Sequence, residues 1–417
     1  MRFIHAADIH LDSPLTGLSA YAGAPVDLLR TATRRAFEGL VDTAISEDVD
    51  FMVIAGDLYD GTWKDFNTGL FFANQMARLR HADIRAVVLH GNHDAESEIS
   101  ARLRLPDNVR VFESRKPDTI ALDDLRVALH GQSFRQRAVS DNLVKHYPEP
   151  RAGWLNIGVL HTALAGREGH ESYAPCDVDD LRSRGYAYWA LGHVHEHEVV
   201  CEAPWVVFPG NLQGRHARET GPRGAVLVTA EGDAVLSVSR VLADVLRWEH
   251  VRVDVEGCET LGEVLARADV ALGRVESLAD GRPVAARVTL HGRTAAHGEL
   301  FGREQHVRAE LQSKAFELGV DRVWIEKLRV DTTPAWSDDD LAARGDAVAE
   351  LRAILHEAAE DPEFMSTLDK ELGDMLLKLA PEVRASDDPL ISAIREKRLR
   401  DVVEQVGPAL VARVSGA

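Results

Sequence analysis

Residues 51–60 read FMVIAGDLYD, and this stretch decides which fold the rest of the chain is expected to have. Phe51–Ala55 is a short apolar run with the composition of a buried strand. Gly56 allows the backbone to turn tightly where the run ends, so Asp57 would project over the edge of a sheet. For this segment taken alone, an Asp that caps a turn is the favoured alternative.

Polar side chains follow an apolar run at four further places along the chain. They are Asp8-Ile9-His10, Gly91-Asn92-His93-Asp94, His161 and Gly192-His193-Val194-His195. Each can be explained singly as a polar strand end, an Asn/Asp-rich turn or a structural histidine. Open α/β sheets, however, bind ligands at the carboxyl ends of their strands, and this mixture of nitrogen and oxygen donors suits Mn²⁺, Fe or Zn²⁺. The five strand ends together therefore predict one metal site.

The order of apolar runs and helical stretches predicts three domains. Strands alternate with helices over residues 1–245, which indicates an α/β sandwich flanked by helices. Residues 246–335 read as strand, helix, strand, helix, strand and predict a small α/β domain. Residues 336–417 read as helical and carry one apolar stripe, formed by Phe364, Leu368, Leu372, Met375 and Leu379. The stripe fits either a docking element for a partner or a helical appendage packed on the protein's own surface.

Charge and cysteine content narrow the class of protein. The formal net charge is −19, from 48 basic and 67 acidic residues, so the basic footprint of a stand-alone nucleic-acid binder is missing. Bound metals would add local positive charge. Cys176, Cys201 and Cys258 form no CxxC pair, which disfavours zinc ribbons and disulfides and fits a reducing compartment. With no signal-peptide pattern and no membrane-spanning apolar run, we expect a cytoplasmic protein without membrane association.

The series D-x-H, GD-x-x-D, GNHD, H and GH-x-H resembles the calcineurin-like metallophosphoesterase superfamily. Three segments narrow the resemblance to SbcD-type DNA-repair exonucleases, and most closely to their YhaO-like branch. They are FIHAADIHLDSPL at 3–15, GDLYDGTWKDFNTGLFF at 56–72, and YWALGHVHEHE at 188–198 followed by VFPGNLQGRHARE at 207–219. The motifs cover residues 1–240, and residues 246–335 are similar to the capping domain of that family.

The resemblance implies a site with two divalent metal ions, for which Mn²⁺ is expected. One ion would be held by Asp8, His10, Asp57 and His195, and the other by Asp57, Asn92, His161 and His193, with Asp57 shared. His93 would face the scissile phosphate as acid or charge stabiliser, with Asp94 orienting it. Some archaeal and eukaryotic relatives carry a second histidine three residues after the shared Asp. This chain has Asp60 there, which leaves His93 as the principal protonic residue.

The sequence therefore predicts a two-metal-dependent DNA exonuclease or endonuclease that hydrolyses phosphodiester bonds in DNA repair. Two metals neutralise phosphoryl oxygens and activate a water for attack. The alternatives are a metallophosphodiesterase or phosphatase for a small nucleotide or other phosphoester, and a relic that serves as a binding scaffold. The complete donor set disfavours the relic. The resemblance further implies DNA and an SMC-like, SbcC-type ATPase as partners, and a possible homodimer.

Several other residues are weaker candidates for contact with the substrate. Trp63–Phe66 combines aromatics with a cation and is either a stacking surface or an ordinary loop anchor. Pro209–Leu212 is a candidate for the substrate rim. The neighbouring Arg215, His216 and Arg218 either touch phosphate or form a solvated basic loop. The remaining histidines considered are expected to be structural, and they are His5, His90, His130 and His197.

Overall fold

The computed structural model divides the chain into two compact units. It describes residues 1–15, 26–60, 66–96, 104–164, 173–319, 321–335, 347–384 and 389–415. The first unit comprises residues 1–249 with 279–285, and the second comprises residues 250–278 with 286–417. The expected loop residues Trp63–Asp65 lie outside the described part of the chain.

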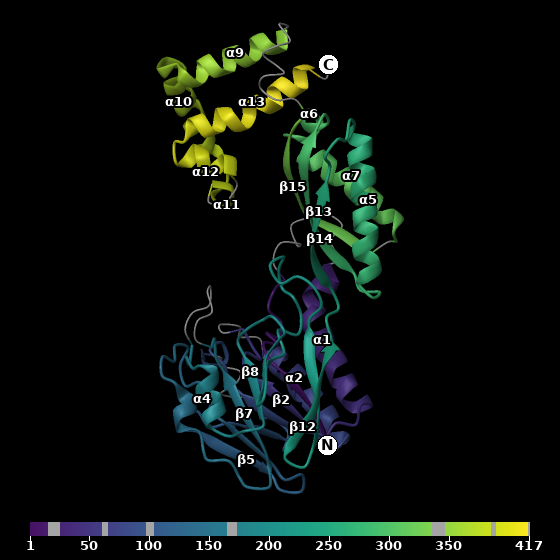
Figure 1. The fold of residues 1–417 in the computed structure, drawn as a ribbon, viewed down its shortest axis with the longest axis vertical. Helices are drawn as coiled ribbons and strands as arrows, with labels where there is room; N and C mark the ends of the chain where they lie inside the picture. Colours follow the sequence, from purple (N-terminus) through teal and green to yellow (C-terminus); the bar gives the residue numbers. More distant parts are fainter. Residues whose placement is uncertain are drawn as a thin grey trace. The chain divides into compact units, whose positions relative to one another are not determined.

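The first unit contains two six-stranded sheets (Figure 1). One sheet has the order β12-β11-β1-β2-β3-β4, formed by Ala234–Leu242, Gly224–Glu231, Arg2–Ala6, Phe51–Ala55, Arg85–Leu89 and Val109–Val111. The other has the order β5-β6-β7-β8-β10-β9, formed by Asp118–Leu122, Val127–Gly131, Leu155–His161, Tyr188–Gly192, Trp205–Phe208 and Glu198–Glu202. The central strands β1, β2 and β3 are parallel, as are β6, β7 and β8.

Apolar residues on both faces of β2 explain why its sheet is buried from two sides. Met52 and Ile54 pack with residues of the helices α1 (Val26–Ser46) and α2 (Phe66–His81). Phe51, Val53 and Ala55 point to the opposite face and pack with residues of the second sheet. Parallel strands that are covered on both faces carry such continuous apolar runs. The expected α/β sandwich flanked by helices is confirmed.

Aromatic rings join the two sheets at the centre of this core. Phe3 of β1 stacks on Phe51 of β2 with ring centroids 4.7 Å apart, and it meets Tyr188 of β8 edge-on at 5.5 Å. Offset stacking and edge-to-face contacts are the favoured arrangements of aromatic pairs. The contacts bring β1, β2 and β8 together, and these are three of the strands whose ends carry the expected metal ligands.

The outer face of the second sheet is covered by shorter elements. Trp189 of β8 packs in a cluster with Leu181 of α4 (Val178–Ser183) and with Val144 of the 3₁₀ helix η2 (Leu143–His146). Asp177 caps α4 with a capping box, since its side chain accepts from the backbone of Asp180 and the Asp180 side chain accepts from the backbone of Asp177. The second sheet is therefore also buried on two sides.

The second unit is built on a three-stranded sheet and a group of helices. The sheet has the order β13-β14-β15, formed by Arg247–Asp254, Val284–Thr294 and Val323–Pro334, of which the first residues of β13 and β14 belong to the first unit. Its helices are α5 (Leu261–Leu278), α6 (His297–Leu300), α7 (Glu304–Glu317), α9 (Ala347–Glu360), α10 (Pro362–Lys378), α11 (Pro381–Arg384), α12 (Pro389–Arg395) and α13 (Leu399–Ser415). The expected boundaries at 245 and 335 stay predictions.

The apolar stripe expected after residue 336 is divided between two environments. Leu372 of α10 packs against a cluster of Ala393, Ile394 and Val402 from α12 and α13. Phe364, on the same helix, remains 42% exposed. Part of the stripe therefore packs on the protein's own helices. None of the helices in the described part of the chain combines the length and apolar character that crossing a bilayer requires.

Candidate metal centre

The carboxyl ends of five parallel strands bring the expected donors together. Asp8 follows β1, Asp57 follows β2, Asn92 follows β3, His161 ends β7, and His193 and His195 follow β8. The registers align the strand ends within each sheet, because Ala6 lies beside Ile54, Ala55 beside Leu89, and His161 beside Gly192. The shared core of the two sheets brings the two sets of strand ends together.

Two glycines allow the strand ends to approach closely. A Cβ atom at Gly192 would lie 2.0 Å from the backbone oxygen of Ala55, and one at Gly91 would lie 2.3 Å from Oδ1 of Asp57. Neither position can hold a larger residue without displacing the backbone or the carboxylate. The turns that carry the donors therefore depend on glycine at these two positions.

Gly192→Ala is expected to lower the free energy of unfolding by about 1–3 kcal/mol or more, because the added methyl group meets backbone that cannot move aside. Chemical denaturation of the two proteins measures the difference. Gly39→Ala is the matched control, since Gly39 lies in α1 with nothing within 4 Å of its added Cβ and alanine favours helix. Equal stability of the Gly192→Ala protein and the parent would contradict the close approach.

Several donor residues have a left-handed backbone. The φ angle is 50° at Asp8, 45° at His10, 51° at Asp57 and 96° at His193. This region is uncommon for residues other than glycine, although Asp and Asn tolerate it better than most. Strained backbone of this kind concentrates at functional sites, where surrounding structure holds it in place.

Among the described residues, three groups of His and Asp side chains have ligand atoms that all lie within 4.8 Å of one another. The groups are Asp8 with His10 and His195, Asp57 with His161 and His193, and His10 with Asp60 and His93. Oδ2 of Asp57 lies 3.4 Å from Nε2 of His161 and 3.9 Å from Nε2 of His10. One carboxylate oxygen thus faces a nitrogen from each of the first two groups. Asn92 joins them, since its Oδ1 lies 2.9 Å from Nε2 of His161.

Burial makes this donor set suited to cations. Asp8 and Asp57 are 1% and 2% exposed, and His10 is 1% exposed. Neither ring nitrogen of His10 has a hydrogen-bond partner among the described residues, whereas buried polar atoms normally have one. Buried carboxylates and imidazoles whose nitrogens and oxygens converge are the ligands that divalent transition metals bind. The residues therefore fit metal ions.

The pKa values of the buried Asp and His donors are shifted by burial and by the contacts of these groups with one another. Burial raises the pKa of Asp8 to about 6. Burial also acts to raise the pKa of Asp57, but His161 and His10 outweigh it and hold that pKa below its usual range. In turn, Asp57 and Asp8 raise the pKa of His161 to about 9 against the effect of burial. A carboxylate that remains ionised while buried is what a site for a divalent cation requires.

His93 lies beside these groups and is held by an acidic side chain. Its Nδ1 atom is 3.0 Å from Oδ1 of Asp60, and this hydrogen bond is the main reason why the pKa of His93 is raised. Its side chain is 31% exposed, so solvent and ligands can reach it. Asp60 entered the sequence-based prediction only as the residue that replaces a second histidine.

The expected role of Asp94 is corrected by its contacts. Asp94 is buried, and its carboxylate accepts hydrogen bonds from the backbone amides of Leu58, Tyr59 and Gly91. It ties the turn after β2 to the turn after β3, and the carboxylate that contacts His93 is that of Asp60. The resemblance implied that Asp94 orients His93, whereas the carboxylate in contact with His93 is that of Asp60 and the contacts of Asp94 are with backbone amides.

Comparisons with known proteins agree with this arrangement. The profile of calcineurin-like phosphoesterases matches residues 1–197, and that of the middle domain of metallophosphoesterase YhaO matches residues 248–333. The chain is 36% identical over 297 residues to the uncharacterized metallophosphoesterase YhaO of Bacillus subtilis (strain 168), which covers 70% of this chain and 72% of that protein. This chain is a calcineurin-like metallophosphoesterase. The resemblance inferred from the strand ends is thereby confirmed.

More distant relatives of this metallophosphoesterase include proteins named DNA double-strand break repair protein Mre11. The one from Methanopyrus kandleri is 29% identical over 218 residues, covering 47% of this chain and 44% of that protein. The one from Sulfurisphaera tokodaii is 24% identical over 260 residues, covering 58% of this chain and 63% of that protein. The chain thus matches less than two thirds of the length of either Mre11 relative.

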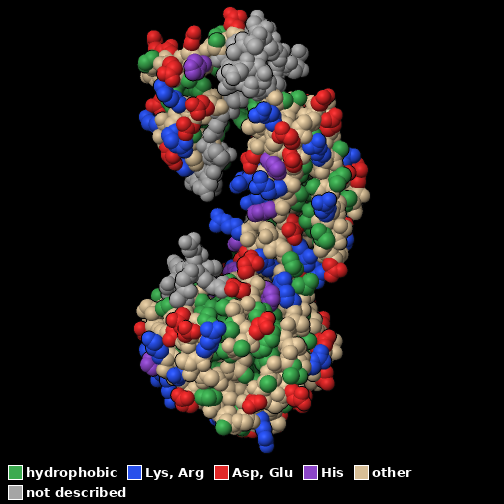
Figure 2. Space-filling view, viewed as in Figure 1, with side chains coloured by type: hydrophobic (Ala, Val, Ile, Leu, Met, Phe, Trp, Pro, Cys, Tyr) green, Lys and Arg blue, Asp and Glu red, His purple; other side chains and the backbone are tan. Residues whose placement is uncertain are grey.

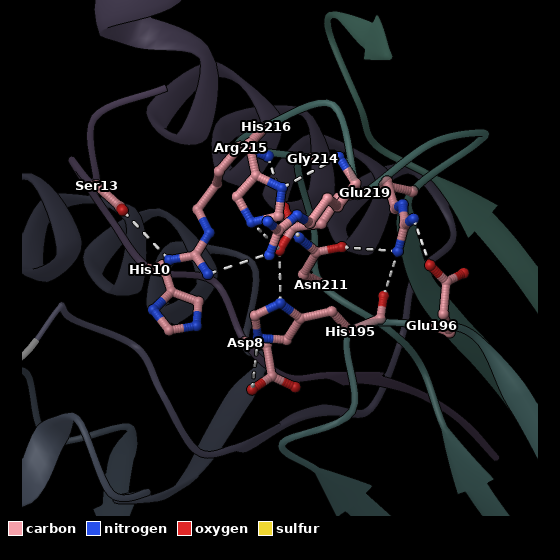
Figure 3. Close-up of polar contacts among 12 residues, drawn as sticks. Asp8, His10, Ser13, His195, Glu196, Asn211, Gly214, Arg215, His216 and Glu219 are labelled. Atoms are coloured by element: carbon pink, nitrogen blue, oxygen red, sulfur yellow. Dashed lines mark hydrogen bonds and ion pairs between the residues drawn. The ribbon is translucent and has the colours of Figure 1, made fainter. Parts of the chain in front are cut away.

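A buried glutamate that the sequence-based prediction missed supports the metallophosphoesterase site (Figure 3). Oε1 of Glu219 lies 2.7 Å from Nδ1 of His195, while Oε2 accepts from Nδ2 of Asn211 at 3.0 Å and from the backbone amide of Arg215 at 2.6 Å. Burial acts to raise the pKa of Glu219, but His195 and Arg215 outweigh it and hold that pKa below its usual range. The ionised Glu219 therefore keeps the proton of His195 on Nδ1, which leaves Nε2 to face Asp8 at 3.9 Å.

Glu219→Gln is expected to weaken Mn²⁺ binding by about 10- to 100-fold, because histidine ligands depend on the carboxylate that orients their second nitrogen. Isothermal titration calorimetry on the metal-free protein measures the affinity directly. Glu196→Gln is the matched control: Glu196 is the residue after His195, and its side chain is 68% exposed and paired with Arg223. If both variants bind Mn²⁺ as the parent does, Glu219 has no part in positioning His195.

Two of the histidines expected to be structural have partners that explain them. His5 is buried with Nδ1 3.0 Å from the Tyr188 hydroxyl and Nε2 3.0 Å from the backbone oxygen of Leu191, and burial lowers its pKa to about 3. His130 lies 2.9 Å from the Thr119 hydroxyl and 3.1 Å from Oδ1 of Asn156. Both rings are engaged by hydrogen bonds within the second sheet or to it, and neither belongs to a donor group among the described residues.

Proposed function

We propose that this metallophosphoesterase is a two-metal-dependent DNA exonuclease or endonuclease that hydrolyses phosphodiester bonds in DNA repair, with Mn²⁺ as its metal. The observation that carries the proposal is the pair of donor groups that meet at Oδ2 of Asp57. The relatives named as double-strand break repair proteins support DNA as the substrate. A repair role and the metal identity go beyond what family membership establishes.

The residues have distinct tasks in this proposal. One ion would be held by Asp8, His10, Asp57 and His195, and the other by Asp57, Asn92, His161 and His193. When bound, the two ions supply Lewis acidity that neutralises the phosphoryl oxygens and activates water. Asp57 would be the ligand shared by the two ions, because its Oδ2 faces both His10 and His161. Glu219 holds Nδ1 of His195, so His195 would ligate through Nε2.

His93 supplies the proton chemistry. Its Nδ1 atom is engaged by Asp60, so Nε2 is the nitrogen available to protonate or hydrogen-bond the departing oxygen of the phosphodiester. The hydrogen bond to Asp60 raises the pKa of His93. Asp94 acts indirectly, because its hydrogen bonds to backbone amides hold together the two turns that carry Asp57 and His93.

A phosphodiesterase or phosphatase for a small nucleotide is the second candidate, and the charge of the chain favours it. The net charge is −19, and on the face shown in Figure 2 acidic and basic side chains of the first unit are interspersed. A duplex-binding protein more often presents a gathered basic surface. Bound metal ions would offset this only near the site.

A comparison of two substrates separates these candidates. The Mn²⁺-loaded protein is incubated with an end-labelled duplex oligonucleotide and with bis(4-nitrophenyl) phosphate, with a chelator as control. Cleavage of the oligonucleotide supports the nuclease, whereas turnover of the small ester alone supports the second candidate. Inactivity on both with two metals bound would contradict both activities for the isolated chain. The SbcC-type ATPase partner, the homodimer and a cytoplasmic location stay predictions that rest on resemblance and composition.

A further inference from the structure

An arginine lies among the donor groups, although no step of the proposed reaction uses it. Arg215 lies on the loop that follows β10, and Nη1 of its guanidinium donates to Oγ of Ser13 at 3.2 Å. Nη2 lies 3.7 Å from Oε1 of Glu219, and the Arg215 side chain is 16% exposed. Figure 3 shows this guanidinium beside the ring of His10. A fixed positive charge thus stands next to residues that would hold cations.

The partners of Arg215 leave much of its hydrogen-bonding capacity unused. Glu219 is shared with His195 and Asn211, and its separation from Nη2 exceeds hydrogen-bond length. Nε of Arg215 is buried and has no hydrogen-bond partner among the described residues. A guanidinium has five N–H donors in a planar fork that matches the oxygens of a phosphate. Arg215 therefore has N–H donors available beside the candidate metal centre, and these donors could bind the oxygens of an anion.

The contacts also connect Arg215 to the residue expected to move protons. Oγ of Ser13 accepts from Arg215 and donates to Oδ2 of Asp60 at 2.8 Å, and Oδ1 of Asp60 contacts Nδ1 of His93. Arg215, Ser13, Asp60 and His93 thus form one chain of hydrogen bonds along the edge of the site. A group bound by Arg215 would lie on the side of the site where the leaving oxygen needs a proton.

We propose that Arg215 binds a non-bridging oxygen of the substrate's phosphate and that Ser13 and Glu219 hold its guanidinium in position for this. The inference rests on the proposed function in one respect, namely that the site accepts a phosphoester. Charge-assisted hydrogen bonds from arginine to phosphate are among the stronger polar contacts in proteins. Arg218, three residues further along the same loop, is exposed and has no such position.

Binding of inorganic phosphate to the Mn²⁺-loaded protein tests the inference without requiring turnover. Calorimetry gives the phosphate affinity, and bis(4-nitrophenyl) phosphate hydrolysis gives KM and kcat. For Arg215→Ala we expect phosphate affinity to fall and KM to rise by about 10- to 100-fold, the effect of removing a charged hydrogen-bond donor. The two Mn²⁺ equivalents should be retained. Arg215→Lys should be intermediate, because an ammonium keeps the charge but loses the fork.

The matched control is Arg218→Ala, which removes the same charge from the same loop and should change phosphate affinity by less than about twofold. Circular dichroism and thermal unfolding check that each variant is folded, and Arg215→Lys keeps the test informative if the alanine variant is not. Unchanged phosphate affinity in both Arg215 variants would overturn the inference. Loss of Mn²⁺ with unchanged phosphate affinity after reloading would also overturn it, because Arg215 would then support the metal ligands only.

The outcomes separate this inference from the nuclease proposal. Arg215-dependent phosphate binding in a protein that cleaves no phosphodiester would leave the inference standing and reject the proposed activity. Cleavage of DNA by the parent, together with parental phosphate affinity in the Arg215 variants, would reject the inference alone. A parent that binds no phosphate when loaded with Mn²⁺ would reject the inference as well.

Discussion

The Asp57→Asn variant is expected to lose both metal ions together. Oδ2 of Asp57 is the oxygen that faces His10 at 3.9 Å and His161 at 3.4 Å, so each donor group depends on the same carboxylate. The amide keeps the shape of the side chain and tolerates the left-handed backbone at this position. It removes the negative charge that a divalent cation requires.

Metal analysis after dialysis against Mn²⁺ measures this effect. We expect two equivalents in the parent and well under one in Asp57→Asn. The matched control is Asp8→Asn, because Asp8 belongs to only one of the two groups that would hold the ions; this variant should keep one equivalent. Two full equivalents in Asp57→Asn would show that Asp57 is not shared between the two ions.

The second large effect is expected for His93→Asn, which should keep both metal ions and lose most turnover. His93 is outside the two groups that meet at Asp57, and its side chain contacts Asp60 and the ring of His10. General acid catalysis by a positioned side chain contributes about 10²- to 10⁴-fold, so kcat should fall by that factor while Mn²⁺ content is unchanged.

Single-turnover hydrolysis of bis(4-nitrophenyl) phosphate measures the loss for His93→Asn. His146→Asn is the control, because His146 is exposed on η2, and this variant should turn over at the parental rate. Parental turnover by His93→Asn would assign the proton transfer to another group. Loss of metal from this variant would instead make His93 a ligand.

The fold and the location of the site followed from local patterns in the sequence. An apolar run that ends in glycine and a carboxylate, as at Phe51–Asp57, predicts a buried strand. It also predicts that the carboxylate lies at the carboxyl end of that strand. Parallel strands bring such ends to one edge of each sheet, and packing between the two sheets joins the two edges. This explains why the donor groups around Asp57 were predictable from residues that are scattered over much of the chain.

Contacts within the site were harder to predict, because they join segments that no local pattern relates. Asp60 reaches His93 across 33 positions, while the adjacent Asp94 turns to backbone amides. Glu219 lies on an irregular loop, and its contact with His195 is what indicates that it positions this histidine. Contacts such as Asp60–His93 and Glu219–His195 depend on side-chain rotamers and on the paths of loops. The hydrophobic periodicity of the sequence does not predict either of these.

The left-handed backbone at Asp8, His10 and Asp57 limits which residues can replace these donors without disturbing the turns. A β-branched replacement would meet a steric penalty of about 1–2 kcal/mol at each position, in addition to the loss of a donor. Asn and Gly are accommodated with little change to the turn. Chains that lose these donors but keep the turns should therefore carry Asn or Gly at the same positions.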